Sequence, residues 1–546
     1  MTEKCLDIIT QITVELHKDD TSLQKLGSGV LYTCGQLSGA VYVLTAKHCL
    51  SGLKDSDRVS LRVYNPESRG YEYVTPSHQI ILRHSTDDAG IIIFNRQELV
   101  TINPNLPSVF VVDKNVEYED AVSKGFPMAS LDQTSTTGES ALVAISMNYR
   151  QEMLTENSFQ LTTSDDYSED TIIGMSGAGI FVEACEELYI NGIFIRYSDE
   201  ERGRIIYAQR LSSFNELLGT EFKKKMPLTY LGHHGLGHKT FENNVNESVA
   251  NLGPRYCQKV NVKTGTARYF GCVAKTQGYY DRVTRVIDVW LTEKSYRIRK
   301  DSPRIGGLES TLKGIRADFG TALAELDRHI EKNIDFTALK KRIDDFSEEI
   351  EQVRHGLYSD YSAVTDGSID LRKEIEADKS RLSEISRDLY SFTSDYEDLK
   401  ISLANNPYLI INGEAGCGKS HLLGDMASNR IAEGLPTLLF LGTDFAGETY
   451  ESTITSKTGF KGTFPEFLSS FNQIGMQVGS RALLMIDALN EGNGATLWKT
   501  RLSGLISAIA EYPAIGLVVS VRSTYYEDVI PDDVESLCHA TIIEHK

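Results

Sequence analysis

The spacing of apolar residues divides the chain into segments of different architecture. Up to about residue 222, short runs rich in β-branched and aromatic residues are separated by turn residues. The runs are GSGVLYTC, AVYVLTA, VSLRVY, AGIIIF, SVFVV, ALVAISM, LYINGIFI and RIIYAQRL. This pattern predicts an all-β barrel or sandwich. The amphipathic stretch LSSFNELLGTEFKKK that follows predicts a closing helix.

Residues 223–304 have a weaker pattern with many Gly and Asn residues, which predicts a flexible connector. His233, His234 and His238 lie in this segment. They could bind a metal, but no carboxylate or cysteine at regular spacing completes a ligand set. The connector interpretation is therefore favoured.

Residues 305–404 are predicted to form long helices. Apolar residues recur at alternating spacings of four and three at Leu339, Ile343, Phe346, Ile350, Val353 and Leu357, and again at Leu382, Ile385, Leu389, Phe392, Tyr396 and Leu399. These are heptad seams, and the break at SAVTDGS predicts an antiparallel hairpin. A third helix starts with Leu308, Leu312, Ile315 and Phe319. Such a region suits spacing and the formation of a homo-oligomer.

From residue 405 to 546, strands that are apolar throughout alternate with helical segments. The strands are YLIING, TLLFLG, ALLMIDAL and GLVVSVRS. Strands of this kind predict a parallel sheet with helices on both faces. The expected fold is therefore multidomain: an all-β part at 1–222, a connector at 223–304, a helical hairpin at 305–404 and an α/β part at 405–546.

Composition narrows the function classes. The net charge of −20 disfavours binding to nucleic acid or to an anionic membrane. No apolar run approaches the length of a membrane span, and the charged N-terminus does not resemble a signal peptide. The eight cysteines form no C-x-x-C pair, so neither a zinc site nor a disulfide framework is indicated. We expect a reduced, cytoplasmic protein.

The stretch GEAGCGKS, Gly413 to Ser420, matches the phosphate-binding loop G-x-x-x-x-G-K-[ST] between a strand and a helix. Gly413, Gly416 and Gly418 let the loop wrap around phosphate oxygens, with backbone N–H groups pointing inward. Lys419 would reach the β- and γ-phosphates and Ser420 would bind Mg²⁺. ATP and Mg²⁺ are the expected cofactors.

Two later strands carry candidate partners of this loop. In LLMIDALNEG, Asp487 ends a strand and can hold the metal through water or through Ser420. Glu491 is a candidate to orient the attacking water, although Asn490 and Glu491 could equally be surface loop residues. Arg522 ends the strand VVSVRS, where it could sense the γ-phosphate.

These motifs resemble those of a known family. IDALNEG with the distal Arg522 resembles the STAND class of signalling NTPases, and NLGPRY, the long helices and INGEAGCGKSHLL resemble the bacterial antiviral STAND (AVAST) proteins over roughly residues 248–546. The resemblance implies an N-terminal effector, an NTPase core and a long C-terminal helical-repeat sensor. No repeat array follows Arg522, so we expect the sequence to be incomplete relative to this family.

The stretch TIIGMSGAGIFV places Ser176 between glycines before an apolar run. Alone, it indicates no more than a small-residue turn before a buried strand. Two other stretches change this interpretation, because YVLTAKHCL carries His48 at the end of a β-run and DDAGIIIF carries Asp88 at the start of another. The order His, Asp, Ser is that of chymotrypsin-like proteases, and LTAKHC, DAGIIIF, GMSGAG and LYINGIFI resemble that family.

The resemblance implies a double β-barrel and a role for each residue. Ser176 would attack the carbonyl, His48 would take its proton, and Asp88 would fix and stabilise the imidazole. The N–H groups of Gly174 and Ser176 would form the oxyanion hole. Asp87 is a rival for Asp88, whereas His78 and His84 lack the preceding LTA strand and are expected to be surface residues.

The sequence differs from chymotrypsin-like proteases at some positions, and one further position bears on which peptide bond would be cleaved. Met175 stands where zymogen-type enzymes carry an aspartate, so activation by N-terminal cleavage is not expected, and a disulfide between Cys34 and Cys49 is doubtful. Asp170, six residues before the serine, is the position at the base of the trypsin-like specificity pocket. It favours cleavage after Arg or Lys. Two alternatives remain: SDDYSED could be only an acidic surface loop, or Arg196 could turn inward and neutralise Asp170.

The leading hypothesis is an antiviral protein in which recognition of a viral protein drives ATP-dependent assembly and activates a serine endopeptidase. An ATP-regulated housekeeping protease and a non-catalytic, nucleotide-switched scaffold are the alternatives.

Overall fold

A computed structural model describes residues 1–20, 24–33, 39–54, 56–112, 120–128, 141–155, 157–163, 167, 172–184, 187–198, 205–222, 225–229, 236–257, 265–292, 302–363, 369–445, 449–536 and 539–545. The chain divides into two compact units. The first contains Met1–Gly253 and Ala427–Ala482, and the second contains Pro254–Met426 and Leu483–Lys546.

The first unit begins with helix α1 (Glu3–Ile12) and a seven-stranded antiparallel sheet in the order β5-β4-β1-β2-β3-β7-β6. The strands are β1 (Thr13–Lys18), β2 (Lys25–Tyr32), β3 (Ala40–Thr45), β4 (Val59–Asn65), β5 (Gly70–Val74), β6 (Ile80–Arg83) and β7 (Gly90–Asn95). Sequence analysis did not predict α1, although Thr2 caps its first turn and Cys5, Ile9 and Ile12 form a buried stripe.

The second sheet of this unit closes into a six-stranded barrel. Its eight strands have the order β12-β9-β10-β11-β14-β13-β8-β15, and β12 also pairs with β13, which closes the ring. The strands are β8 (Phe110–Val112), β9 (Ala121–Gly125), β10 (Val143–Thr155), β11 (Ser158–Thr163), β12 (Gly179–Ala184), β13 (Glu187–Ser198), β14 (Ile205–Arg210) and β15 (Leu228–Thr229). One closed β-barrel is present where the resemblance implied two. Within the described residues, the N-terminal strands form a seven-stranded sheet without a pairing that closes it.

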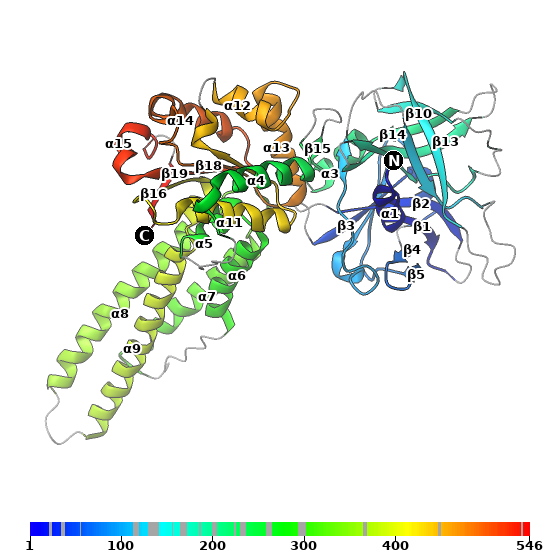
Figure 1. The fold of residues 1–546 in the computed structure, drawn as a ribbon. Helices are drawn as coiled ribbons and strands as arrows, with labels where there is room; N and C mark the ends of the chain where they lie inside the picture. Colours follow the sequence, from blue (N-terminus) through cyan, green and yellow to red (C-terminus); the bar gives the residue numbers. More distant parts are fainter. Residues whose placement is uncertain are drawn as a thin grey trace. The chain divides into compact units, whose positions relative to one another are not determined.

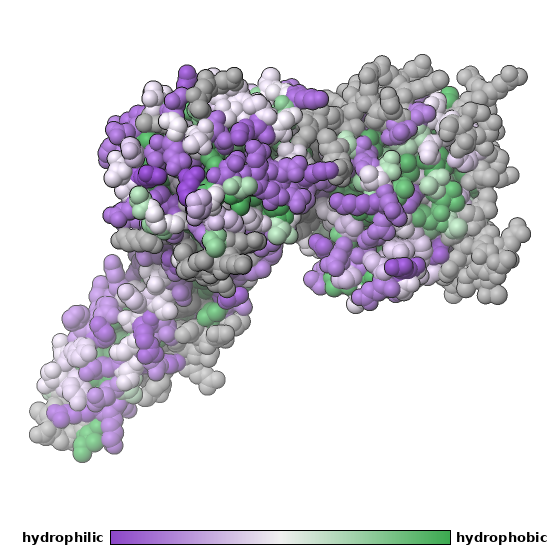
Figure 2. Space-filling view, viewed as in Figure 1, coloured by the Kyte–Doolittle hydropathy of each residue, from purple (hydrophilic) through white to green (hydrophobic). Residues whose placement is uncertain are grey.

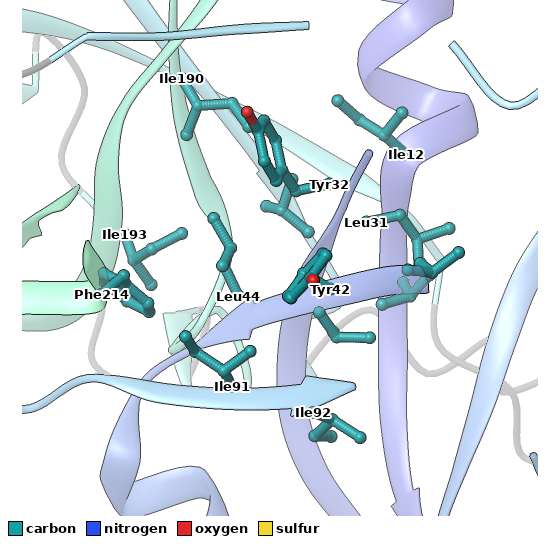
Figure 3. Close-up of a cluster of buried hydrophobic side chains, with 14 of the residues drawn as sticks. Ile12, Leu31, Tyr32, Tyr42, Leu44, Ile91, Ile92, Ile190, Ile193 and Phe214 are labelled. Atoms are coloured by element: carbon teal, nitrogen blue, oxygen red, sulfur yellow. The ribbon is translucent and has the colours of Figure 1, made fainter. Parts of the chain in front are cut away.

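One hydrophobic core joins the two sheets. Leu44 on β3 and Ile91 on β7 are buried in the same cluster as Ile190 and Ile193 on β13. Figure 3 shows Phe214, from helix α3 (Leu211–Phe222), beside Ile193 in this cluster. Consecutive residues of β3 and β7 are buried in this cluster, so both strands are apolar along their length. Burial of this shared core holds the ends of β3 and β7 near the barrel.

The segment predicted as a connector is largely helical. Helices α4 (His238–Leu252), α5 (Ala267–Ala274) and α6 (Gln277–Thr292) lie within residues 223–304. The expectation of a flexible connector is wrong there, because apolar side chains at helical spacing are buried: Phe241, Val245 and Leu252 on α4, and Tyr280, Val283 and Ile287 on α6. Many Gly and Asn residues obscured this periodicity.

The helical hairpin agrees with the heptad seams. Helices α7 (Leu308–Ala324), α8 (Thr337–Ala363) and α9 (Ile369–Asp398) form in the predicted places, and α8 and α9 lie side by side (Figure 1). The seam residues Ile343, Phe346, Leu382 and Ile385 are fully or almost fully buried. Hydrophilic residues dominate the visible surface of this pair of helices (Figure 2).

A third, five-stranded sheet follows, in the order β17-β18-β19-β16-β20. Its strands are β16 (Tyr408–Gly413), β17 (Thr437–Leu441), β18 (Ala482–Asp487), β19 (Ile515–Arg522) and β20 (Thr541–Glu544), and β16 pairs in parallel with β19 and β20. The helices of this part are α10 (Ile401–Asn405), α11 (Lys419–Ala432), α12 (Tyr450–Lys457), α13 (Phe464–Val478), α14 (Gly494–Ala510) and α15 (Tyr526–Val529). The predicted alternation of apolar strands and helices is thus present. Within the described residues, no helix is long and apolar enough to cross a membrane.

Candidate functional sites

His48 and Asp88 are brought together by strand register. Antiparallel pairing of β3 with β7 sets Thr45 opposite Gly90, so the residues after β3 and before β7 meet at one end of the sheet. Asp88 Oδ2 lies 2.7 Å from His48 Nδ1, and Asp88 Oδ1 accepts a bond of 2.9 Å from the His48 backbone N–H. The carboxylate therefore fixes both the ring and the backbone of the histidine.

The charges of this pair reinforce each other. The hydrogen bond to Asp88, with a further contribution from Cys49, raises the pKa of His48 from 6.5 to about 10. Burial alone would raise the pKa of Asp88, but the hydrogen bond and charge of His48 outweigh burial and lower it. An imidazole held in this way can accept and keep a proton at Nε2.

Ser176 lies on a turn that is tied to the N-terminal sheet. The Ser28 backbone N–H on β2 donates to Ser176 O at 2.8 Å, and Thr45 Oγ1 donates to Ser28 O at 2.8 Å. Gly177 has φ 89°, and a Cβ there would come within 2.0 Å of Ser28 O, so only glycine fits. Cys49, next to His48, has its Sγ 3.4 Å from Ser176 O. The three candidate residues thus share one region.

The serine hydroxyl itself does not contact the histidine. Ser176 Oγ donates to Ile195 O on β13 at 2.8 Å. Among the described residues, no hydrogen bond joins Ser176 Oγ to His48. Because χ1 of serine has three staggered positions, a rotation about one bond would redirect the hydroxyl.

The segment proposed as an oxyanion hole is also held in place. Gly174 has φ 101°, and a Cβ there would lie 2.6 Å from Phe126 O. Its carbonyl accepts a bond of 2.8 Å from Ser28 Oγ. Met175, which stands in place of a zymogen aspartate, is fully buried in the barrel core. Apolar packing therefore anchors this turn.

The sequence offered Asp87 as an alternative to Asp88, and His78 and His84 as alternatives to His48. Asp87 contacts Ser213 and Asn157 and not His48. His78 is exposed, whereas His84 is buried and its Nδ1 accepts from the Asp87 backbone N–H, so the surface expectation fails for His84.

Two further predictions concern the cysteines Cys34 and Cys49 and the specificity residues Asp170 and Arg196. Cys49 is a free thiol, with Gly27 against its Sγ, and Cys34 lies outside the described residues. Asp170 also lies outside them, and Arg196 stacks its guanidinium 4.5 Å from the centre of the Tyr207 ring.

A second candidate site surrounds the loop between β16 and α11. A cavity of about 470 Å³ is lined by Ala415, Gly416, Gly418, Lys419, Ser420, His421, Asp487, Ala488, Asn490, Glu491, Ser520 and Arg522, together with Pro254 and Arg255. Gly416 and Gly418 have φ values of 82° and 100°, which glycine adopts without strain. A Cβ at Gly413 would lie 2.6 Å from His545 O. The loop thus needs glycine at all three positions.

The charged groups in this cavity fit a nucleotide with a divalent metal. Lys419 Nζ donates to Gly413 O and Glu414 O, both at 2.7 Å, so the ammonium is held at the loop. Asp487 is 1% exposed, and its Oδ1 accepts from Ser520 Oγ at 2.6 Å. Its buried Oδ2 has no hydrogen-bond partner among the residues that the structure describes. An unsatisfied buried carboxylate oxygen of this kind, in the cavity beside the loop of Gly413–Ser420, suits a hard cation.

Glu491 is held by two arginines. Arg255 Nη1 lies 3.0 Å and 3.1 Å from the two carboxylate oxygens of Glu491, and Arg522 Nη2 lies 3.4 Å from one of them. Asn490 Oδ1 accepts from the Arg522 backbone N–H at 3.1 Å. Sequence reasoning placed Glu491 and Arg522 here but assigned no role to Arg255 or Ser520. The arginine of NLGPRY was the available signal for Arg255.

His238, one of the three candidate metal-binding histidines, begins α4, and His233 and His234 lie outside the described residues. In the part of the chain that the structure describes, no cluster of three or more His, Cys, Asp or Glu side chains could hold a metal.

Comparison with known proteins found no matching family model and no matching curated protein. The two sites are therefore interpreted from their own geometry.

Proposed function

We propose that the chain is a serine endopeptidase whose activity is controlled by a nucleotide. The observation that carries this proposal is the His48–Asp88 pair, 2.7 Å apart, beside the tied turn of Ser176. A carboxylate, an imidazole with its second nitrogen available and a serine on a glycine turn are the parts needed for acyl transfer.

The reaction would begin with rotation of Ser176 Oγ from Ile195 O to His48 Nε2. The hydroxyl proton passes to His48 as Oγ bonds to the substrate carbonyl carbon, and the N–H groups of Gly174 and Ser176 bind the oxyanion. His48 then gives this proton to the departing amine as the peptide bond breaks. Water hydrolyses the acyl ester by the same proton transfers and restores the serine.

A fluorophosphonate probe tests this proposal directly, because it reacts with activated serines. We expect labelling of Ser176, found by peptide mass mapping, and loss of both labelling and peptide hydrolysis in Ser176→Ala. Absence of both in the intact protein, with and without ATP, would instead favour the non-catalytic scaffold.

For the second site we propose binding of ATP with Mg²⁺. The metal would supply charge neutralisation of the phosphates. The loop at Gly413–Gly418 would wrap the phosphates and Lys419 would pair with their charge, while Ser420 and Asp487 would hold the metal. Glu491 would orient water, and Arg522 would pair with the terminal phosphate. Calorimetric titration with ATP, with and without Mg²⁺, tests this assignment.

The resemblance to antiviral STAND proteins suggests the setting. In a cytoplasmic protein of this class, a C-terminal helical-repeat sensor recognises a viral protein, and ATP-bound subunits form a homo-oligomer that activates the protease domains. Growth arrest on phage infection that depends on both Ser176 and Lys419 would support this role. Dependence of ordinary protein turnover on the same residues would favour a housekeeping protease.

For the substrate we propose a protein cleaved after Arg or Lys, with Asp170 pairing with the basic side chain. Stacking of Arg196 on Tyr207 gives its guanidinium a partner other than Asp170. A positional-scanning peptide library on the active protein, repeated with Asp170→Ser, tests the assignment. Preference for an acidic or apolar residue would refute it.

A further inference from the structure

Asp87 and the backbone N–H of Asp88 lie in the loop between β6 and β7 of the N-terminal sheet, but both are bound by residues of the β-barrel part and α3. Asp87 Oδ2 accepts from Ser213 Oγ on α3 at 2.7 Å and from Asn157 Nδ2, between β10 and β11, at 2.9 Å. The backbone N–H of Asp88 donates to Gln209 Oε1 on β14 at 3.3 Å. These contacts span more than 65 residues of sequence.

The partners of the aspartates also bind one another. Gln209 Nε2 donates to Ser213 Oγ at 2.7 Å and to Asn157 O at 2.7 Å. Ser213 is fully buried and Gln209 is 3% exposed. Ser213 accepts from Gln209 and donates to Asp87, so a directed chain of hydrogen bonds ends on a carboxylate, which strengthens each bond.

We propose that Asp87, Asn157, Gln209 and Ser213 are positioning residues that fix Asp88, and through it His48, relative to the serine turn. This inference rests on the proposed peptidase function. His48 and Asp88 lie at one end of the N-terminal sheet, after β3 and before β7, whereas Ser176 lies before β12 of the barrel. We call the four positioning residues the clamp. The clamp joins the N-terminal sheet to the barrel beside the His48–Asp88 pair, which must act together with Ser176. A small misplacement of reacting groups is costly, since proximity and orientation supply much of the rate.

The test compares Ser213→Ala with Ser212→Ala in the full chain. Ser212 is the neighbouring serine, and within the described residues its hydroxyl makes a single long contact, 3.5 Å to Asn157 Oδ1. We expect Ser213→Ala to lower kcat about tenfold with little change in KM, because one bond to the clamp carboxylate is lost. Ser212→Ala should keep the original kcat. Equal values for both variants would overturn the proposal.

A second readout does not depend on peptidase activity. Histidine labelled with ¹³C at Cε1 reports the pKa of His48, assigned with His48→Gln. Displacement of Asp88 should move the His48 pKa toward 6.5 in Ser213→Ala and in Asn157→Ala, and not in Ser212→Ala. Asn157→Ala matters because Asn157 lies in a half-buried turn, where substitution perturbs the core less than at Ser213.

The two readouts separate two failures. An unreactive Ser176 in the intact protein would refute the peptidase, and the His48 titration would still test the clamp. An unchanged His48 pKa in both Ser213→Ala and Asn157→Ala would refute the clamp, whatever the peptidase activity.

Discussion

The two candidate sites hold their reactive groups in the same way but are built differently. Ser176 Oγ and Lys419 Nζ both donate to main-chain carbonyl oxygens, and neither is bound to the group with which it is proposed to act. In the serine site the His48–Asp88 pair is already formed. In the site around the loop of Gly413–Ser420, Asp487 Oδ2 has no hydrogen-bond partner within the described part of the chain, and two arginines contact Glu491.

The difference teaches what each site needs to become active. The serine site needs rotation of one side chain, whereas the phosphate-loop site needs a ligand that satisfies Asp487 and competes for the arginines. This contrast suits a peptidase that is assembled in advance and a nucleotide site that responds to its ligand. The contrast can be tested by variants that affect either the preformed His48–Asp88 pair or the contacts of the second site that depend on a ligand.

The largest effect is expected from Asp88→Asn. The amide keeps the shape but removes the charge that stabilises the imidazolium and sets the tautomer of His48, so kcat should fall about 10⁴-fold. Asp87→Asn is the matched control. Asp87 is hydrogen-bonded to Ser213 and Asn157 and acts on His48 only through Asp88, so the decrease in kcat should be far smaller. Peptide hydrolysis measured under saturating substrate distinguishes them, and equal losses would contradict the assignment of Asp88.

The pH dependence should follow the raised pKa of His48. Catalysis needs the neutral imidazole, so kcat/KM should increase about tenfold per pH unit above neutrality and level off near pH 10. A plateau already at pH 7 would show that the Asp88 bond does not hold the proton as proposed. Initial rates in buffers of constant ionic strength provide the measurement.

The same pKa has a consequence for folding stability. The folded protein binds the His48 proton more tightly than the unfolded chain does, since the pKa is raised from 6.5 to about 10. This contribution is complete below pH 6.5 and is lost as the pH rises toward 10. Rising activity and falling stability are therefore expected over one pH range.

Lys419→Ala should weaken ATP binding on the order of 100-fold, because it removes the buried charge that pairs with the phosphates. Its carbonyl partners Gly413 O and Glu414 O would remain available to water. Calorimetry measures the affinity, and fluorophosphonate labelling of Ser176 checks that the serine site is intact. Unchanged ATP affinity would show that Lys419 does not contribute to ATP binding.

The sequence predicted most of the regular structure because its periodicities are strong. The heptad seams of α8 and α9 and the apolar strands β16 to β19 formed where expected, since each buries a continuous face. The helices at residues 238–292 were missed because Gly and Asn weaken the pattern, while tertiary burial of Phe241 and Val283 stabilises them.

How well a site could be predicted from the sequence depended on how close together its residues are along the chain. The phosphate-binding loop is contiguous, so its geometry follows from one stretch of sequence. The contacts of Asp87 join residues from three separate segments of the sequence, and no spacing rule reveals them. Asp88 could be preferred over Asp87 from its place before a strand, but the contacts of either carboxylate depend on how the two sheets pack.

The smallest effect is expected from Glu491→Gln, which weakens the hold on Arg255 and Arg522. In the wild-type protein, the phosphates must compete with the Glu491 carboxylate for two guanidinium groups, 3.0 Å and 3.4 Å from one of its oxygens. The neutral amide competes less and removes one negative charge from the cavity, so ATP should bind roughly threefold to tenfold more tightly. ATP hydrolysis should fall at the same time, because the amide cannot accept a proton from water.

Glu414→Gln is the matched control for this variant, because it removes the same charge from an exposed side chain of the phosphate-binding loop. If the gain in affinity arises from release of the arginines, Glu414→Gln should leave the calorimetric Kd almost unchanged. Equal gains would show that net charge alone sets the affinity. Weaker binding in Glu491→Gln would mean that the carboxylate orients the arginines toward the phosphates, and the proposed competition would be wrong. The sign of this small effect therefore decides whether Glu491 restrains the nucleotide site before ATP binds or prepares it.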